Sequence, residues 1–431
     1  MGIWKPSPAS QQIARTHKGL QSHFQNILPD LKPEDTWASP YAVFEYTPNP
    51  EFINGFEELL AFKKLLESKG KKLLLDFVPN HVAVDSPYIT EHPDVFLLAE
   101  DDVSEHNRFL HHNGRFYAHG KDPYFDGWTD TIQFDFSKLE TTELQTRFLE
   151  NISGYCHGVR CDMAMLPLKT VFEKTHGKPG ADFWEKIVPN IKKIHPGFVF
   201  VGEVYWELEY TLQQLGFDYT YDKKLYDRLK TNDPTQITSH LKAEENFQNH
   251  SLRFLENHDE ERSFETFGAN TIPYFALLCF LPGMVLSYEG QTVGRKQRLP
   301  VQLSRLPEEA PNNELKEIYN SIFSTIVSRN KTKKLERRIF SFETYEEFRS
   351  ELIVYGLVEE GTLKELLVLN PYKFVTSGWV HLKEFSFSKD VVQFQDVLTK
   401  TSYEKSAQEL KEKGVYFQLG GFSSHWFVVG E

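Results

Sequence analysis

The chain has 431 residues, enough for two or three domains and a large hydrophobic core. Its formal net charge of -13 at pH 7 argues against a nucleic-acid partner, because proteins that bind nucleic acids normally present a basic surface. The three cysteines give no disulfide framework, and no apolar run is long enough to span a membrane, so we expect a reduced, cytoplasmic protein without a membrane partner.

The elements expected along the chain alternate between helices and buried strands. Met1 to Trp4 has the pattern of a strand end, and we expect a loop-rich region from there to about residue 50, because prolines at positions 6 and 8 oppose regular structure. Apolar residues at helical spacing over 55–69 predict a helix that ends at Gly70. Further helices are expected over 142–152 and 183–194, and strands over 73–78, around Val159, and over 198–201, 217–219, 252–255 and 284–287.

Two segments depart from this alternation. From His81 to about Asp135 the pattern gives way to a long stretch rich in histidine, aspartate, glycine and aromatic residues, which is typical of a functional insertion. After about residue 340, short β-rich runs separated by turn residues predict an antiparallel β domain. The alternation favours a (β/α)8 barrel over a doubly wound sheet, since no glycine-rich phosphate-binding loop is present.

Acidic side chains follow several of the expected strands. Arg160 and Asp162 are two residues apart and therefore share one strand face, where the guanidinium would keep the carboxylate ionised. Glu203 follows a glycine in an apolar strand, where burial favours the protonated carboxyl that a general acid needs. Asp259 is a third acid. Two or three carboxylates in one pocket are the groups that glycoside hydrolysis requires.

Four short segments together resemble the motifs of the α-amylase superfamily, whose members are retaining enzymes that act on α-glucosides. The segments are Asp76-Phe77-Val78-Pro79-Asn80-His81, Gly158-Val159-Arg160-Cys161-Asp162-Met163-Ala164, Gly202-Glu203 and Asn257-His258-Asp259. The resemblance implies that Asp162 is the nucleophile, Glu203 the general acid/base and Asp259 the stabiliser of the transition state.

The resemblance also implies a binding subsite for the sugar at the cleavage point. Its residues would be Tyr41, His81, Arg160 and His258, with Asp76 as a structural carboxylate beside them. In relatives the residue at Asn80 often helps to hold calcium, but six or more oxygen ligands cannot be recognised in the insertion, so calcium is left open and no other cofactor is expected.

The fold implied by the resemblance is an α/β (β/α)8 TIM barrel with an irregular insertion after the third strand and a C-terminal antiparallel β-sandwich. The barrel would take residues 1–81 and 134–340, the inserted domain 82–133 and the C-terminal domain 341–431. Counting back from Asp76 in the third strand leaves Met1 to Trp4 as the end of the second. The first strand and most of the second are therefore expected to be absent from this sequence.

We expect an α-amylase-like enzyme that cleaves or transfers α-linked glucosyl units of oligo- or polysaccharides by a retaining double displacement. The alternative is a non-catalytic carbohydrate-binding or interaction protein on the same scaffold, because a fold does not fix a function. Met165 and Leu166 stand where the family often has lysine or histidine against the acceptor sugar. Glucan length, linkage and the choice between hydrolysis and transfer are left open.

Overall fold

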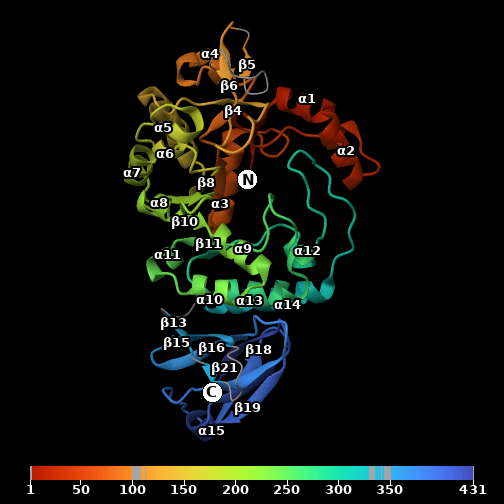
Figure 1. Ribbon diagram of the computed structural model, residues 1–431, viewed down its shortest axis with the longest axis vertical. Helices are drawn as coiled ribbons and strands as arrows, with labels where there is room; N and C mark the ends of the chain where they lie inside the picture. Colours follow the sequence, from red (N-terminus) through yellow and green to blue (C-terminus); the bar gives the residue numbers. More distant parts are fainter. Residues whose placement is uncertain are drawn as a thin grey trace. The chain divides into compact units, whose positions relative to one another are not determined.

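A computed structural model describes residues 2–99, 108–111, 113–329, 335–340, 342–343 and 351–430 (Figure 1). The chain divides into two compact units. The first unit consists of Met1–Tyr221, His250–Leu252 and Leu299–Pro307, and the second unit of Asp222–Asn249, Arg253–Arg298 and Glu308–Glu431. Among the described residues, no helix is both long and apolar enough to cross a membrane.

A six-stranded sheet contains the buried strands that the sequence predicts. Its order is β12-β11-β10-β9-β8-β3, and the pairs from β3 to β11 are parallel. Leu75, Val159 and Phe200 are almost completely buried, as expected of parallel strands covered on both faces. The strands are β3 (Leu74–Phe77), β8 (Gly158–Cys161), β9 (Val199–Gly202), β10 (Tyr219–Tyr221), β11 (Ser251–Arg253) and β12 (Met284–Val285).

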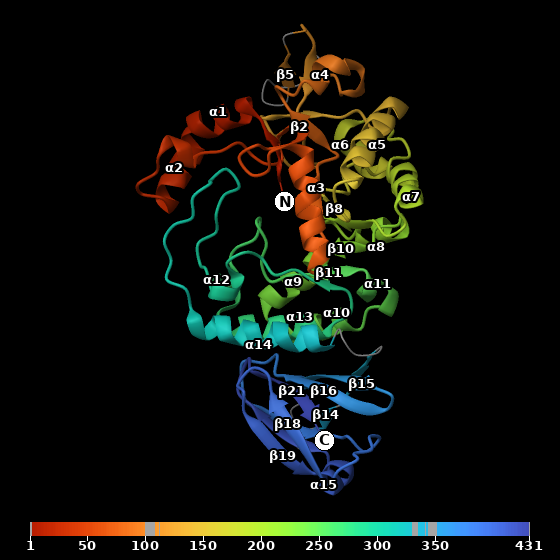
Figure 2. The same cartoon turned by 180° about the vertical axis from the view of Figure 1, so that it is seen from behind.

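Helices of the first unit pack against this sheet. Figures 1 and 2 show α5, α7 and α8 on the outer side of β8 and β10, and the indole of Trp184 in α7 donates a hydrogen bond to the carbonyl of Ala164 at 2.7 Å. The helices are α1 (Pro8–Thr16), α2 (Lys18–Ile27), α3 (Gly55–Ser68), α4 (Tyr88–Glu91), α5 (Leu139–Ser153), α6 (Lys169–His176), α7 (Trp184–Ile194) and α8 (Glu209–Gln214), with 3-10 turns at Pro33–Asp35 and Pro93–Val95.

The prediction of a loop-rich region up to residue 50 is wrong. Pro8 lies in the first turn of α1, where its missing N–H costs no helical hydrogen bond, and the Ser7 hydroxyl caps this turn by accepting from the N–H of Ser10 at 2.9 Å. The first residues do form a strand, β1 (Trp4–Pro6), but it pairs antiparallel with β2 (Val43–Pro48) in a sheet of its own. The closed eight-stranded barrel stays a prediction.

The insertion after β3 is irregular, as the sequence predicts. Its first strand, β4 (His81–Ala83), pairs antiparallel with β7 (Thr131–Gln133), so the segment leaves and returns at neighbouring positions. Within it, β5 (Arg108–Leu110) pairs with β6 (Phe116–Ala118).

The C-terminal part of the second unit is an antiparallel sandwich, which confirms that prediction. Its six-stranded sheet β13-β15-β16-β21-β18-β19 and its three-stranded sheet β14-β17-β20 share one core, to which Leu366, Val380 and Phe417 belong. The predicted domain boundaries stay predictions. The strands are β13 (Glu336–Ile339), β14 (Phe342–Glu343), β15 (Ile353–Glu359), β16 (Thr362–Leu369), β17 (Thr376–Val380), β18 (Val391–Asp396), β19 (Ser402–Ser406), β20 (Val415–Leu419) and β21 (Ser424–Gly430).

Three arginines satisfy the backbone carbonyls at and just after the end of helix α13 (Thr271–Phe280). Arg329 donates to the Cys279 carbonyl at 2.8 Å, Arg337 donates to the Phe280 carbonyl at 2.7 Å, and Arg253 donates to the carbonyl of Pro282. Positive charge at this end complements the helix dipole. The other helices of this unit are α9 (Lys223–Thr231), α10 (Pro234–Leu241), α11 (Glu245–Asn249), α12 (Ser263–Phe267), α14 (Asn313–Arg329) and α15 (Ala407–Glu412), with 3-10 turns at Gly268–Asn270 and Gln291–Val293.

The close approach of β8 and β9 gives a testable expectation. Gly158 lies opposite Val199, and a Cβ atom at Gly158 would collide with the Val199 carbonyl oxygen. We expect Gly158→Ala to lower the free energy of unfolding by about 1–3 kcal/mol, the usual cost of overpacking. Gly197→Ala is the matched control, because a Cβ there meets no atom within 4 Å, and it should change stability by less than about 0.5 kcal/mol. Equal urea midpoints for the two variants would contradict the close approach.

Candidate active site

The guanidinium of Arg160 connects carboxylates from three neighbouring strands. Its Nη1 donates to Asp162 Oδ1 at 2.8 Å and lies 3.6 Å from Asp76 Oδ1, while Nη2 donates to Glu203 Oε2 at 2.7 Å. The parallel register aligns these groups, because Asp76 lies opposite Arg160 and the carboxyl ends of β3, β8 and β9 meet at one edge. The structure therefore brings together four of the residues that the sequence predicts.

All four side chains are buried, so their charges depend on one another. Burial disfavours the charged form of Arg160, yet the negative charges around it, led by Glu203, outweigh this effect and hold the pKa of the guanidinium well above its ordinary value. Arg160 is therefore a permanent cation, and removing it would take away the positive charge that compensates the buried carboxylates.

The two oxygens of Glu203 have different surroundings. Oε2 accepts hydrogen bonds from Arg160 Nη2 and from the backbone N–H of Met163 at 2.8 Å, whereas Oε1 accepts only from the Tyr205 hydroxyl at 2.7 Å among the contacts of the described residues. An oxygen held by two donors is a poor place for a proton. Oε1 is therefore the oxygen of Glu203 that can carry and deliver one.

Aromatic rings flank the guanidinium. The ring centroids of Tyr41 and Tyr221 lie 5.3 and 5.8 Å from the Arg160 guanidinium carbon. The sequence predicts Tyr41 but misses Tyr221, the last residue of β10, although an aromatic residue at the end of a buried strand is a signal for such a position. Burial raises the pKa of Tyr221 to about 12, so its hydroxyl keeps its proton at neutral pH.

His81 is buried at the start of the insertion. Its ring centroid lies 5.1 Å from that of Trp128, and burial lowers its pKa to about 4, with a backbone hydrogen bond to Tyr41 acting in the opposite direction. The imidazole is therefore neutral at pH 7 and suits hydrogen bonding to an uncharged group.

Asn80, at which the sequence leaves calcium open, follows β3 and contacts the returning strand β7. Its side-chain amide pairs with that of Gln133: Oδ1 accepts from Gln133 Nε2 at 3.0 Å, and Nδ2 lies 3.1 Å from Gln133 Oε1. The described residues also contain no group of three or more His, Cys, Asp or Glu side chains arranged to hold a metal. The pairing ties the segment after β3 to the returning strand β7.

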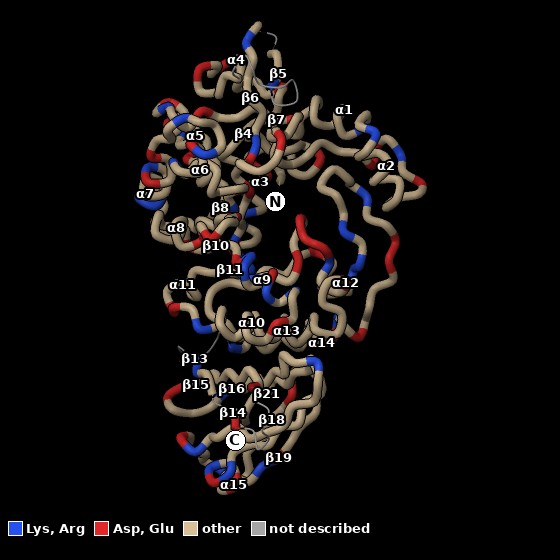
Figure 3. The backbone as a smooth tube through the Cα atoms, viewed as in Figure 1, with Lys and Arg blue, Asp and Glu red and all other residues tan. Residues whose placement is uncertain are grey.

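His258 and Asp259 belong to the second unit and contact each other, with His258 Nε2 3.0 Å from Asp259 Oδ2. The Asn257 side chain accepts from the N–H groups of Asp259 and Glu260, each at 2.9 Å, and so shapes the loop that follows β11. Figure 3 shows acidic residues along this loop before α12.

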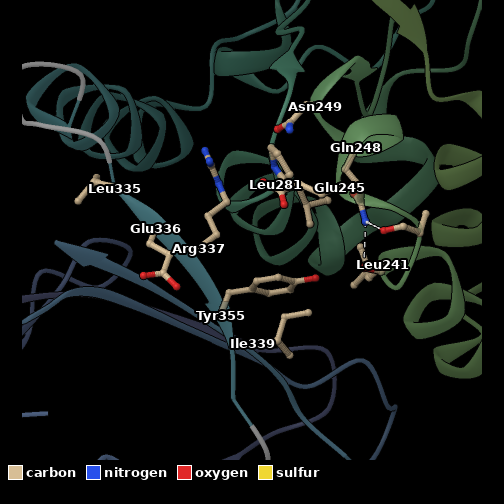
Figure 4. Close-up of a pocket in the computed structure, with 12 residues that line it drawn as sticks. Leu241, Glu245, Gln248, Asn249, Leu281, Leu335, Glu336, Arg337, Ile339 and Tyr355 are labelled. Carbon is tan, nitrogen blue, oxygen red and sulfur yellow. Dashed lines mark hydrogen bonds between the residues drawn. The ribbon is translucent and has the colours of Figure 1, made fainter. Parts of the chain in front are cut away.

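The second unit also has a pocket of about 620 Å³ (Figure 4). Gln248 and Leu281 line one part of it, and Arg337 and Tyr355, from β13 and β15, line another. None of the predicted site residues lines this pocket, so it is distinct from the carboxylate cluster around Arg160.

No protein-family model and no curated protein matches this sequence, but solved structures do. A noncanonic maltogenic α-amylase, AmyB, from Thermotoga neapolitana is 21% identical, with a TM-score of 0.67 over 92% of this chain and 86% of that chain. An α-amylase from Geobacillus thermoleovorans, complexed with acarbose, is 16% identical, with a TM-score of 0.66 over 91% and 84%. The chain has the α-amylase fold.

A third structure with the α-amylase fold is a debranching enzyme from Nostoc punctiforme, which is 18% identical, with a TM-score of 0.65 over 90% of this chain and 82% of that chain. At sequence identities this low, structural similarity establishes the fold alone. The chemistry depends on the side chains at the strand ends.

Neutral His81 makes the stability of the fold depend on pH. Its pKa of about 4 in the fold lies below the ordinary 6.5, so the unfolded chain binds the proton more tightly. The contribution of neutral His81 to the free energy of unfolding is about 3 kcal/mol. It is complete above about pH 6.5 and is lost as the pH falls towards about 4. We expect His81→Gln to lose less stability than the wild type between about pH 7 and pH 4.5 in urea unfolding. An equal loss in both proteins would contradict this assignment.

Proposed function

We propose that this protein is an α-amylase-like enzyme that cleaves or transfers α-linked glucosyl units of oligo- or polysaccharides with retention of configuration. The observation that carries the proposal is the single guanidinium that binds both Asp162 and Glu203. Retaining glycosidases need their two carboxyl groups only about 5 Å apart, so that one attacks the anomeric carbon while the other reaches the leaving oxygen. Carboxylates on adjacent nitrogens of one guanidinium are held close in this way.

The reaction has two displacements. Asp162, kept ionised by Arg160, attacks the anomeric carbon while Glu203 delivers its Oε1 proton to the leaving oxygen; the glycosidic C–O bond breaks and a glycosyl ester on Asp162 forms. Glu203, now a carboxylate, then takes a proton from water or from a sugar hydroxyl, whose oxygen attacks the same carbon and releases Asp162. No electron acceptor or cofactor is needed for either step.

The remaining roles rest on the motifs and on the chemistry of the side chains. Asp259, in Asn257-His258-Asp259, stabilises the positive charge of the oxocarbenium-like transition state. Tyr41, His81 and His258 bind the sugar at the cleavage point, together with Arg160. Neutral His81 hydrogen-bonds a hydroxyl without adding charge, and Asp76 is the structural carboxylate beside Arg160.

The substrate is an α-glucan, and an acidic protein surface does not oppose an uncharged polymer. Since the similar α-amylase from Geobacillus thermoleovorans is complexed with acarbose, acarbose is also a suitable probe of this site.

Replacement of either central carboxylate tests the assignment directly. We expect Asp162→Asn and Glu203→Gln each to lower kcat on maltoheptaose by at least about a thousandfold, because each removes a group that forms or breaks a bond. Asp182→Asn is the control, since Asp182 is half exposed in a surface ion pair with Lys169 and should keep wild-type turnover. Wild-type turnover by Asp162→Asn would refute the mechanism.

Chromatography of the products from maltoheptaose separates hydrolysis from transfer. Shorter maltooligosaccharides without any longer product indicate hydrolysis. Products longer than the substrate, or products joined to an added sugar acceptor, indicate transfer, which also releases the shorter leaving sugar. Because Asn80 pairs with Gln133, we expect a chelator to leave the product pattern and rate unchanged. A loss of activity that added calcium restores would contradict this expectation. Binding of maltoheptaose without any product would instead favour a non-catalytic carbohydrate-binding protein.

A further inference from the structure

Arg337 differs from the other two arginines that contact the end of α13. Arg329 and Arg253 each form an ion pair with a carboxylate. Arg337 donates its Nε hydrogen to the Phe280 carbonyl, and its two Nη groups have no hydrogen-bond or ion-pair partner among the residues that the structure describes. A guanidinium with two available Nη groups suits a phosphate or a carboxylate, because it can bind two oxygens of either group at once.

Arg337 lines the pocket of about 620 Å³ in the second unit (Figure 4). On β13, Arg337 and Ile339 are two residues apart and share one face, and Ile339 lies opposite Tyr355 of β15. Arg337 and Tyr355 are therefore diagonal neighbours on the side of the sheet that faces the pocket. The volume lies within the range of pockets that hold small organic molecules and is far larger than one inorganic ion needs.

Tyr355 provides a second polar group without a partner. The residue is 5% exposed, and its hydroxyl makes no hydrogen bond to any described residue. Burial raises the pKa of Tyr355 to about 12, with the charge of Arg253 acting in the opposite direction, so the hydroxyl keeps its proton at neutral pH. Figure 4 shows this hydroxyl directed across the pocket towards its helical side. Buried hydroxyls are normally paired, so an unpaired one beside a pocket indicates a ligand group that hydrogen-bonds to it.

Two carboxylates also line the pocket, and neither pairs with Arg337 in the described contacts. Glu336 accepts hydrogen bonds from Nε and Nη2 of Arg338, each at 3.0 Å, so Arg338 compensates its charge. Glu245 is exposed in the first turn of α11, where water and salt screen its charge. The positive charge of Arg337 is therefore available to an anion in the pocket.

We infer that this pocket binds a sugar-sized organic anion, whose phosphate or carboxylate group pairs with Arg337 and whose hydroxyl groups contact Tyr355. A bare ion would fill only a small part of the pocket, and an apolar tail would leave the Tyr355 hydroxyl without a partner. Leu241 and Leu281 supply apolar surface for the carbon skeleton. The pocket contains none of the carboxylates around Arg160, so this inference goes beyond the proposed function and does not depend on it.

Calorimetry with four probes tests the inference. We expect glucose 6-phosphate or glucuronate to bind at least about tenfold more tightly than glucose and inorganic phosphate, and the tighter of the two anions identifies the charged group. Arg337→Gln should raise the Kd of that anion at least about tenfold, because a charge-assisted pair is lost, and Tyr355→Phe should raise it about fivefold, the size of one neutral hydrogen bond. Arg115→Gln is the matched control, since Arg115 is 46% exposed in a surface ion pair and does not line the pocket.

The opposite results are equally specific. Wild-type Kd in Arg337→Gln, equal Kd values for the anions and glucose, or binding of inorganic phosphate as tight as that of either anion would overturn the inference, and so would the absence of binding by all four probes. If Arg337→Gln fails to fold, Arg337→Lys and Tyr355→Phe decide the question, because lysine keeps the charge but cannot bind two oxygens in parallel. Wild-type affinity in both folded variants would then refute the site.

Turnover of maltoheptaose separates this inference from the proposed function. In the absence of added anions, Arg337→Gln should keep wild-type turnover, since Arg337 lies outside the carboxylate cluster. A wild type that binds the anion through Arg337 but releases no product from maltoheptaose would refute the proposed function and leave this inference standing.

Discussion

One guanidinium among three carboxylates is the constraint on which the rest of the first unit depends. Arg160 is buried, and its charge is stable only because Asp162, Glu203 and Asp76 surround it. The carboxylates in turn can be buried only because the cation is present. A parallel sheet satisfies both requirements at once, since neighbouring strands in register end at one edge and carry their last side chains to the same place.

The strands position the charges, whereas the loops directly after them direct the chemistry. Met163 turns its backbone N–H towards Glu203 Oε2, and Tyr205 covers Oε1, so the two oxygens of one carboxyl group become chemically different. Met163 is itself in the left-handed region, and Tyr205 precedes the left-handed residue Trp206. Rigid packing of the strands holds these strained turns in place, because a flexible support would let them relax.

Buried arginines in the second unit have different partners from those of Arg160. Arg329 pairs with Glu365 and also donates to the Cys279 carbonyl, whereas Arg253 pairs with Asp222 and also donates to the Gln248 side chain and to the Pro282 carbonyl. These arginines hold the end of an apolar helix, α13, against strands of the sandwich. Arg329 and Arg253 each pair with one carboxylate and thereby stabilise packing, in contrast to Arg160, which several carboxylates share.

The sequence by itself determined the buried strands, the carboxylates at their ends and the C-terminal sandwich, because continuous or alternating apolar runs and short local motifs carry that information. It did not determine α1, where a proline in the first turn looks like a helix breaker, or α13, which is apolar on all sides and has no helical period. Only the tertiary structure decided that Asn80 pairs with Gln133, that Tyr221 flanks Arg160 and that Tyr124 meets Trp206. Each of these contacts joins residues more than 50 positions apart, and local sequence patterns contain no information about which distant side chains will meet.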